Sequence, residues 1–225
     1  MKKILVVAAT ALELRPFLDF LEPFASAHQP SVYEKDGRQI YVSITGAGMM
    51  QSAAHIMEAI LEFQPDVAVQ AGIGGSFDLS LPLGSLLLVS QEMPGDIGVE
   101  DEDGFVHIAD MGFADKNAFP FREGWLSSGF PDWPCLNELP KVKGLTVNTI
   151  SGISDTIEQR RQRYSCVVES MEGAAFHYVC LLKKIPFVQL RAVSNYVEPR
   201  NKDRWEIVKA VHNLNDWLLT HIFTV

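Results

Sequence analysis

The sequence contains few cysteines and lacks long apolar runs and basic runs. Three of its 225 residues are cysteines, Cys135, Cys166 and Cys180, and they lie far apart. This number and spacing exclude a disulfide framework and match no metal-ligand pattern, so a reducing, cytoplasmic environment is expected. No apolar run approaches the roughly 20 residues that a membrane-spanning helix requires.

Positive charge is also scarce. The chain has 28 acidic residues against 19 lysines and arginines, which gives a formal net charge of −9. Such a chain repels the phosphate backbone of a nucleic acid. We therefore expect neither a nucleic-acid partner nor, without an apolar run, a membrane partner.

The chain does have enough apolar residues for a large core. They make up 47% of the sequence, and 225 residues suit one domain spanning residues 1–225. The N-terminus resembles a signal peptide because two lysines precede an apolar run, but Glu13 and Arg15 interrupt it. We expect residues 3–9 to form a buried strand.

Strand-like and helix-like segments alternate along the chain. Strands are expected at residues 3–9, 65–70, 85–90, 144–150, 166–168 and 187–193, and a hairpin at 31–45. Helices are expected from residue 10, capped by Thr10, and over residues 51–63, 156–164, 174–182 and 205–223. This order predicts a single-domain, three-layer α/β/α fold with a central mixed sheet.

Three polar side chains fall at the ends of predicted strands. They are Glu13, Glu172 and Asn195. Strand carboxyl ends gather along one edge of such a sheet, so these groups are expected to converge there. Taken singly, each glutamate is equally explained as a charge in the first turn of a helix, where it favours the helix dipole.

Two glycine-rich segments follow other predicted strands. Residues 45–48 include Gly46 and Gly48, and the predicted loop 71–76 includes Gly72 and Ile73. Glycines there let backbone N–H groups approach a ligand. Two carboxylates and an amide beside such loops suit cleavage of a glycosidic bond, in which one carboxylate activates water and another group binds the sugar hydroxyls.

These motifs together resemble the nucleoside phosphorylase and nucleosidase superfamily, in particular its methylthioadenosine/S-adenosylhomocysteine nucleosidase branch. The motifs lie at residues 9–13, 45–48, 71–75, 151–152, 169–175 and 191–195, so the resemblance covers nearly the whole chain. It implies a nucleoside phosphorylase-like fold, a small-molecule nucleoside substrate and a homo-oligomer, a dimer or higher. Neither a cofactor nor a metal is expected for this chemistry.

The resemblance also implies roles for single residues. Glu13 matches the acid that activates the attacking water, Glu172 matches the acid that holds the ribose hydroxyls, and Met171 matches the methionine that packs against the ribose. The other positions expected to bind substrate are Gly46, Gly48, Gly72, Ile73, Ser151 and Gly152.

Asn195 departs from the nucleosidases, which have aspartate at this position. An asparagine amide can donate a hydrogen bond to a six-oxo group while its carbonyl accepts one from a protonated purine N7. Asn195 therefore predicts a catalytic role in releasing hypoxanthine or guanine rather than adenine, because mismatched hydrogen-bonding groups in a buried site discriminate by roughly 10⁴-fold.

The nucleophile is expected to be water. A phosphorylase needs cations for its phosphate, and residues 71–90 contain no basic residue. Residues 168–176 and 194–205 resemble the futalosine hydrolase family, which implies release of hypoxanthine from futalosine in menaquinone biosynthesis. Three alternatives stay open: an adenine-releasing nucleosidase, a six-oxopurine phosphorylase and a non-catalytic nucleoside-binding protein.

The same resemblance implies a site for the carboxylated aromatic group at the five-prime end of futalosine. Arg200, Arg204 and residues of the 91–133 segment are candidates by position, although solvated charges at a helix start explain the two arginines equally well. No aromatic residue that could stack on the purine lies near residues 151–156.

Overall fold

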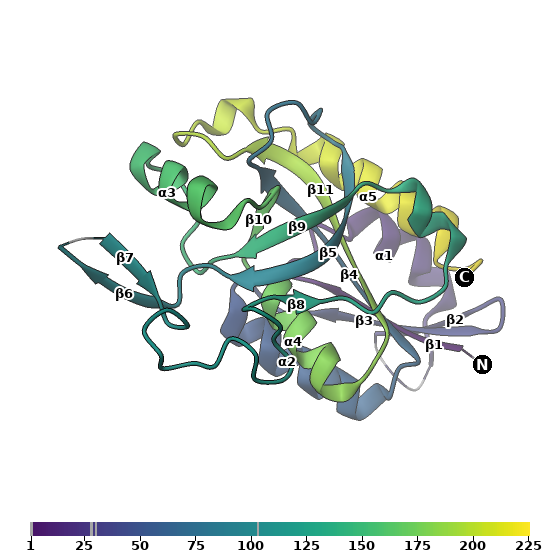
Figure 1. The fold of residues 1–225 in the computed structure, drawn as a ribbon. Helices are drawn as coiled ribbons and strands as arrows, with labels where there is room; N and C mark the ends of the chain where they lie inside the picture. Colours follow the sequence, from purple (N-terminus) through teal and green to yellow (C-terminus); the bar gives the residue numbers. More distant parts are fainter. Residues whose placement is uncertain (1, 28, 30, 103) are drawn as a thin grey trace.

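A mixed β-sheet lies between two layers of helices (Figure 1). The computed structural model describes residues 2–27, 29, 31–102 and 104–225. Helices α2 (Met49–Phe63) and α4 (Gly173–Lys183) pack together against one face. Helices α1 (Arg15–Leu21) and α5 (Ile207–His221) lie against the other. The predicted three-layer α/β/α fold is confirmed.

The strands of the main sheet follow the order β10-β9-β5-β11-β4-β1-β3-β2, with β8 paired to β5. Their bounds are β1 Lys2–Ala8, β2 Val32–Lys35, β3 Arg38–Ile44, β4 Val67–Ser76, β5 Leu86–Pro94, β8 Leu126–Ser127, β9 Lys141–Thr146, β10 Val168–Ser170 and β11 Phe187–Tyr196. Strand β1 is parallel to β3 and β4, whereas β5 is antiparallel to β11. The sheet is therefore mixed, and β2 with β3 forms the predicted hairpin.

Part of the sheet closes on itself. The short strand β10 pairs in parallel with β9 and antiparallel with β4. Strands β4, β11, β5, β9 and β10 thus form a closed circuit of pairings. This closure brings the ends of β4, β10 and β11 together beside the end of β1.

The remaining elements lie outside this circuit. Strands β6 (Gly98–Asp101) and β7 (Gly104–His107) form a separate hairpin that projects from the body in Figure 1. Helix α3 (Ser154–Tyr164) follows β9. Three short 3₁₀ helices cover Glu22–Phe24, Pro134–Glu138 and Lys202–Arg204.

Strand β1 shows how the sheet separates two apolar layers. Ile4, Val6 and Ala8 belong to the cluster beneath α1 and α5, while Leu5 and Val7 belong to the cluster beneath α2 and α4. Successive side chains of a strand point to opposite faces, so a continuous apolar run is buried on both. The predicted buried first strand is confirmed.

Two local predictions are wrong. Residues 71–76 are not a loop, because β4 continues to Ser76. A Cβ at Gly74 would lie 2.8 Å from Val168 Cγ2 and 3.0 Å from the Glu169 carbonyl oxygen, so glycine there admits the neighbouring strand β10. Thr10 does not cap a helix either, because α1 begins at Arg15 after Leu14.

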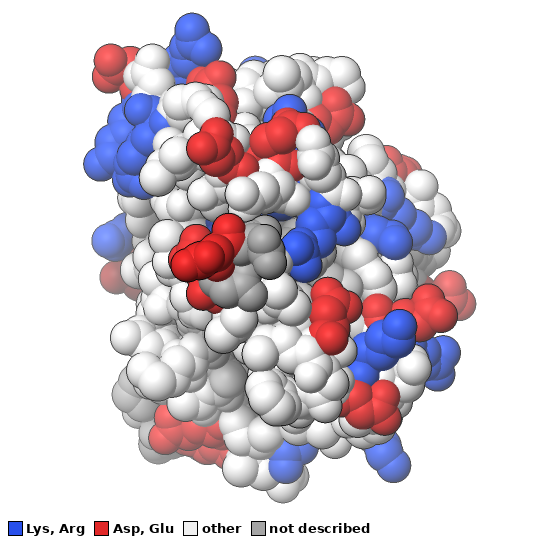
Figure 2. Space-filling view, turned by 60° about the vertical axis from the view of Figure 1, so that its left-hand side comes forward, with Lys and Arg blue, Asp and Glu red and all other residues white. Residues whose placement is uncertain are grey.

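The structure also shows the state of the cysteines and the distribution of surface charge. Within the described residues no helix is long and apolar enough to cross a membrane. Cys135, Cys166 and Cys180 are all buried and free. On the face of the described residues that Figure 2 shows, basic side chains lie in separate groups interspersed with acidic ones, and much of that surface is uncharged.

Candidate active site

A cavity of about 330 Å³ opens where β1, β4, β10 and β11 end and α4 begins. Six of the predicted site residues line it: Glu13, Ile73, Ser151, Met171, Glu172 and Asn195. Four predicted glycines, Gly46, Gly48, Gly72 and Gly152, are not among its lining residues. The chain thus brings together side chains that are up to 182 positions apart between Glu13 and Asn195.

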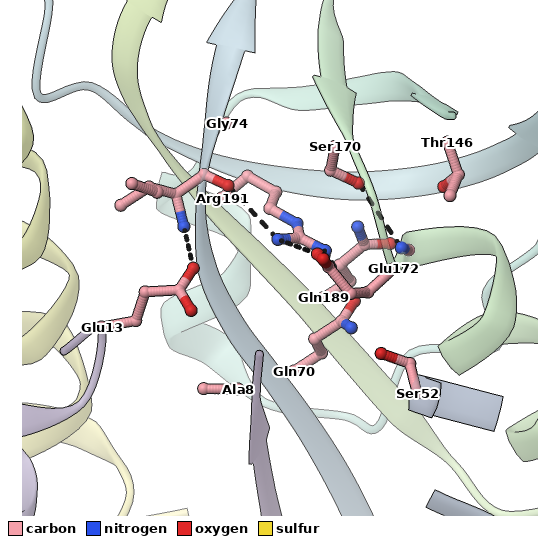
Figure 3. A network of polar contacts seen from close by, with 12 residues as sticks. Ala8, Glu13, Ser52, Gln70, Gly74, Thr146, Ser170, Glu172, Gln189 and Arg191 are labelled. Carbon is pink, nitrogen blue, oxygen red and sulfur yellow. Dashed lines mark hydrogen bonds and ion pairs between the residues drawn. The ribbon is translucent and has the colours of Figure 1, made fainter. Parts of the chain in front are cut away.

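Glu13 is buried with its carboxylate fixed by three donors. Its Oε2 accepts hydrogen bonds from the backbone N–H and the hydroxyl of Thr10, each 2.9 Å long. Its Oε1 accepts one of 3.0 Å from the backbone N–H of Ile73 (Figure 3). Thr10 therefore orients the Glu13 carboxylate instead of capping α1.

Glu172 precedes the first residue of α4 and is only 5% exposed. Its Oε1 accepts a 3.2 Å hydrogen bond from the Gly48 backbone N–H. Its Oε2 lies 3.4 Å from Nη1 and 3.5 Å from Nη2 of Arg191. The second acid of the site is thus held by an ion pair that is itself buried.

Arg191 lies in the motif at residues 191–195, but no role was predicted for it from the sequence. Besides Glu172, its guanidinium donates to Gln70 Oε1 at 3.1 Å and to the Ile73 carbonyl oxygen at 3.3 Å. The available signal was an arginine inside a mostly apolar predicted strand, because a fully buried cation needs a partner.

Gly72 lies close to both Glu13 and Arg191, although it does not line the cavity. A Cβ built on it would stand 2.5 Å from Arg191 Nη1 and 3.0 Å from Glu13 Oε1. Any side chain there would displace one of these groups. Gly72 therefore permits Glu13 and the Arg191–Glu172 pair to share this small volume (Figure 3).

Asn195 is placed by a β-bulge at Ser194, where the register between β11 and β4 shifts. The Ser194 hydroxyl donates to Asn195 Oδ1 at 2.8 Å, and Asn195 Nδ2 donates to the Tyr196 carbonyl oxygen at 3.0 Å. A carbonyl oxygen only accepts, so the amide nitrogen must face Tyr196. This fixes which end of the amide is the donor.

Glu169 organises the loop that carries Ser151. Its carboxylate accepts from the Ser151 backbone N–H at 2.8 Å and from the Ser151 hydroxyl at 2.5 Å. The guanidinium of Arg160 lies 3.1 Å from the same carboxylate. Glu169 thus holds one wall of the cavity in place.

The rest of the cavity wall is mostly apolar and was not identified from the sequence. It includes Leu12, Ile150, Tyr196, Val197, Trp205 and Ile207. Arg200 also lines this part, with its guanidinium carbon 5.4 Å from the centre of the Trp205 ring. Arg204 does not line the cavity and pairs with Glu198 instead, so only Arg200 of the two candidate cations reaches the site.

The chain as a whole matches a known protein family. A family model described as the phosphorylase superfamily covers residues 3–220. The chain belongs to the phosphorylase superfamily. The family and the enzyme class predicted from the sequence, a nucleosidase, are confirmed by this match and the relatives below.

Several relatives extend the match. The futalosine hydrolase of Thermus thermophilus is 30% identical over 217 residues, which is 93% of this chain and 91% of that protein. The futalosine hydrolase of Streptomyces coelicolor is 31% identical over 158 residues, 67% of this chain and 63% of the relative. A solved structure, the 5′-methylthioadenosine/S-adenosylhomocysteine nucleosidase of Neisseria meningitidis with methylthio-immucillin-A, has a TM-score of 0.80 at 18% identity, with both chains fully covered.

Proposed function

We propose that the protein hydrolyses the N-ribosidic bond of futalosine and releases hypoxanthine and dehypoxanthine futalosine, a step of menaquinone biosynthesis. The observation that carries the proposal is the Asn195 amide, which lines the same cavity as Glu13 and Glu172. The identity to the futalosine hydrolases of Thermus thermophilus and Streptomyces coelicolor supports it.

In the proposed reaction Glu13 is the general base. Its carboxylate takes a proton from water, and the water oxygen attacks the anomeric carbon as the bond to the purine nitrogen breaks. The transition state has oxocarbenium character, as in other glycosidic cleavages. Glu172 holds the ribose hydroxyls, and Met171 packs against the sugar.

Asn195 stabilises the departing base in this mechanism. Its fixed amide nitrogen has a second N–H that donates to the six-oxo group, while its oxygen accepts a hydrogen bond from N7, which takes up a proton from solvent as the base leaves. An adenine amino group would present a donor to that N–H. We therefore assign to Asn195 the preference for hypoxanthine.

Hydrolysis rather than phosphorolysis is supported by the charges of the cavity. Among the described residues that line it, Arg200 is the one with a lysine or arginine side chain. The nearby Arg191 is already bonded to Glu172, Gln70 and the Ile73 carbonyl oxygen. A phosphate dianion beside Glu13 would meet repulsion that the already bonded Arg191 is not free to offset.

Arg200 and Trp205 are proposed to receive the carboxylated aromatic group of futalosine. Arg200 lies over the Trp205 ring at the cavity wall, where it offers a cation to the carboxylate and the ring offers a stacking surface. Leu12 and Ile207 contribute apolar surface to the same wall.

The test is incubation of the purified protein with futalosine, inosine and methylthioadenosine in phosphate-free buffer, followed by identification of the released base. Hypoxanthine from futalosine alone is expected. Adenine from methylthioadenosine with futalosine left intact would instead establish an adenine-releasing nucleosidase. This alternative is considered because the chain shares its fold with the Neisseria meningitidis enzyme. Release only after phosphate is added would establish a phosphorylase.

We also propose that the chain forms a homo-oligomer in a reducing cytoplasm. Met50 and Leu61 on α2 are 81% and 59% exposed, and Phe113 in the segment after β7 is 78% exposed. Large apolar side chains at such exposure suit a subunit interface. Light scattering after size-exclusion chromatography would give the mass of the assembly.

A further inference from the structure

Behind the cavity lies a buried polar cluster that the proposed reaction does not use. Glu92 of β5, Thr146 of β9, His177 of α4 and Gln189 of β11 are all 0% exposed. None of them lines the cavity. A buried acid and a buried imidazole without solvent contact require an explanation from their partners.

Glu92 is bonded to the start of the helix that follows Glu172. The Thr146 hydroxyl donates to Glu92 Oε2 at 2.8 Å and accepts from the Ala174 backbone N–H at 2.7 Å. Gly173 adds a second contact, because a Cβ there would lie 2.1 Å from Glu92 Oε1. Glu92 thus touches the first turn of α4 directly and through Thr146 (Figure 3 shows Thr146 near Glu172).

The hydrogen-bond partners of His177 indicate the state of this cluster. His177 Nδ1 lies 3.0 Å from the Leu126 carbonyl oxygen, so Nδ1 carries the proton. Burial lowers the pKa of His177 to about 4, which leaves Nε2 an acceptor. His177 Nε2 and Gln189 Oε1 are both buried and have no hydrogen-bond partner among the described residues.

A single proton on Glu92 allows both His177 Nε2 and Gln189 Oε1 to form a hydrogen bond. Gln189 Nε2 lies 2.8 Å from Glu92 Oε1, and the same amide interacts with His177. The nitrogen and oxygen of an amide are exchanged by a half turn. After that turn the amide nitrogen donates to His177 Nε2, and its oxygen accepts from Glu92, provided that Glu92 carries a proton.

The charges around Glu92 agree with a bound proton. Burial, with a smaller contribution from Glu172, raises the pKa of Glu92 to about 7, although Gln189, Arg191 and Thr146 oppose the shift. Of the other titratable groups that face it, His177 is neutral and the buried Cys166 thiol has a raised pKa. The cation that acts on Glu92 is Arg191, and it already pairs with Glu172.

We propose that Glu92, held as a neutral acid, is a positioning residue for Glu172. It fixes the first turn of α4 through Thr146 and Gly173, and, being uncharged, it does not compete with Glu172 for the Arg191 guanidinium. Loss of its proton places a second carboxylate near that guanidinium and weakens the hold on Glu172. This inference rests on the proposed role of Glu172 in binding ribose.

The test is the pH dependence of kcat and KM for wild type, Glu92→Gln and Glu92→Leu, with the exposed Glu100→Gln as control. Whichever nucleoside the wild type cleaves is the substrate. In wild type, KM is expected to rise as the pH passes about 7, while kcat changes less. Glu92→Gln, which resembles the neutral acid, should keep the low KM at every pH. Glu92→Leu should raise KM about tenfold or more at all pH values, because Glu172 is displaced.

A KM that rises equally in wild type and Glu92→Gln would overturn the inference. So would an infrared difference spectrum between wild type and Glu92→Gln that lacks a carboxylic acid C=O band at slightly acid pH. The spectrum needs no turnover. Failure of the proposed function would instead show as a wild type that cleaves none of the nucleosides, with the band still present.

Discussion

The carboxylate of Glu172 and the guanidinium of Arg191 form an ion pair with Oε2 3.4 Å from Nη1, although both residues are at least 95% buried. Such a pair stabilises a fold only while both partners are present, because each charge alone would be desolvated without compensation. The first prediction tests this dependence.

Arg191→Met should lower the free energy of unfolding by about 3–5 kcal/mol, since it leaves the Glu172 charge buried and unpaired. Urea denaturation at neutral pH measures the change. The matched control is Arg204→Ala, which removes an exposed pair with Glu198 and should cost under about 1 kcal/mol. Equal losses in the two variants would contradict the argument.

Glu13→Gln should lower kcat by about 10²–10⁴-fold, because the amide cannot accept the proton of the attacking water. The fold should persist, since the amide oxygen can still accept from Thr10 or Ile73. Steady-state release of the base measures kcat. Glu22→Gln, an exposed acid after α1, is the control and should behave as wild type; retained activity in Glu13→Gln would remove Glu13 from the mechanism.

Gly72→Ala should displace either Glu13 or Arg191, the residue that pairs with Glu172. The new Cβ would stand within 3.0 Å of Arg191 Nη1 and Glu13 Oε1, so one of them must move. A loss of about 10²-fold in kcat is expected from displacement on the order of an ångström. Gly129→Ala is the control, because a Cβ there meets nothing within 4 Å. Comparable kcat in the two variants would show that the site tolerates the shift.

Asn195→Asp should change the choice of base. The aspartate oxygen that replaces Nδ2 would face the Tyr196 carbonyl oxygen, and the donor to a six-oxo group would be lost. The kcat/KM for the hypoxanthine nucleoside should fall by about 10²-fold or more relative to that for the adenine nucleoside. Competition between the two substrates gives this ratio directly. Asn195→Ala should slow both, and an unchanged ratio in Asn195→Asp would assign the specificity elsewhere.

Glu92 and His177 should make opposite contributions to the pH dependence of stability. The pKa of Glu92 is raised from 4.5 to about 7, so the folded state binds more protons than the unfolded state in that range, and the unfolding free energy falls as pH rises. The pKa of His177 is lowered from 6.5 to about 4, so its contribution rises with pH instead. Each pKa shift corresponds to a change of roughly 3 kcal/mol in the free energy of unfolding.

Chemical denaturation of Glu92→Gln and His177→Asn from about pH 4.5 to 7 separates the two terms. The stability of Glu92→Gln relative to wild type should increase across this range. That of His177→Asn relative to wild type should decrease. Two variants with parallel profiles would mean that the buried cluster does not titrate as described.

Much of the architecture follows from local sequence patterns. The buried β1, the hairpin of β2 and β3 and the amphipathic α5 are predicted because burial leaves a characteristic apolar pattern in each: a continuous run in β1, alternation in the hairpin and a helical period in α5. Glu172 falls at the start of α4, as the change from strand to helix indicates. The mistake at residues 71–76 arose because Gly74 accommodates the distant strand β10, and the mistake at Thr10 arose because Thr10 donates to the nearby Glu13 instead of capping α1.

The layered fold, the family and the presence of two acids and an amide near strand ends could all be predicted from the amino-acid sequence. How these side chains are held became visible only in the assembled fold. The bulge at Ser194 that places Asn195, the closure of the sheet through β10 and the pairing of Arg191 with Glu172 all join segments that are distant in the chain. Local propensity carries no information about such contacts, because burial and the hydrogen bonds between those segments arise only once the sheet is assembled.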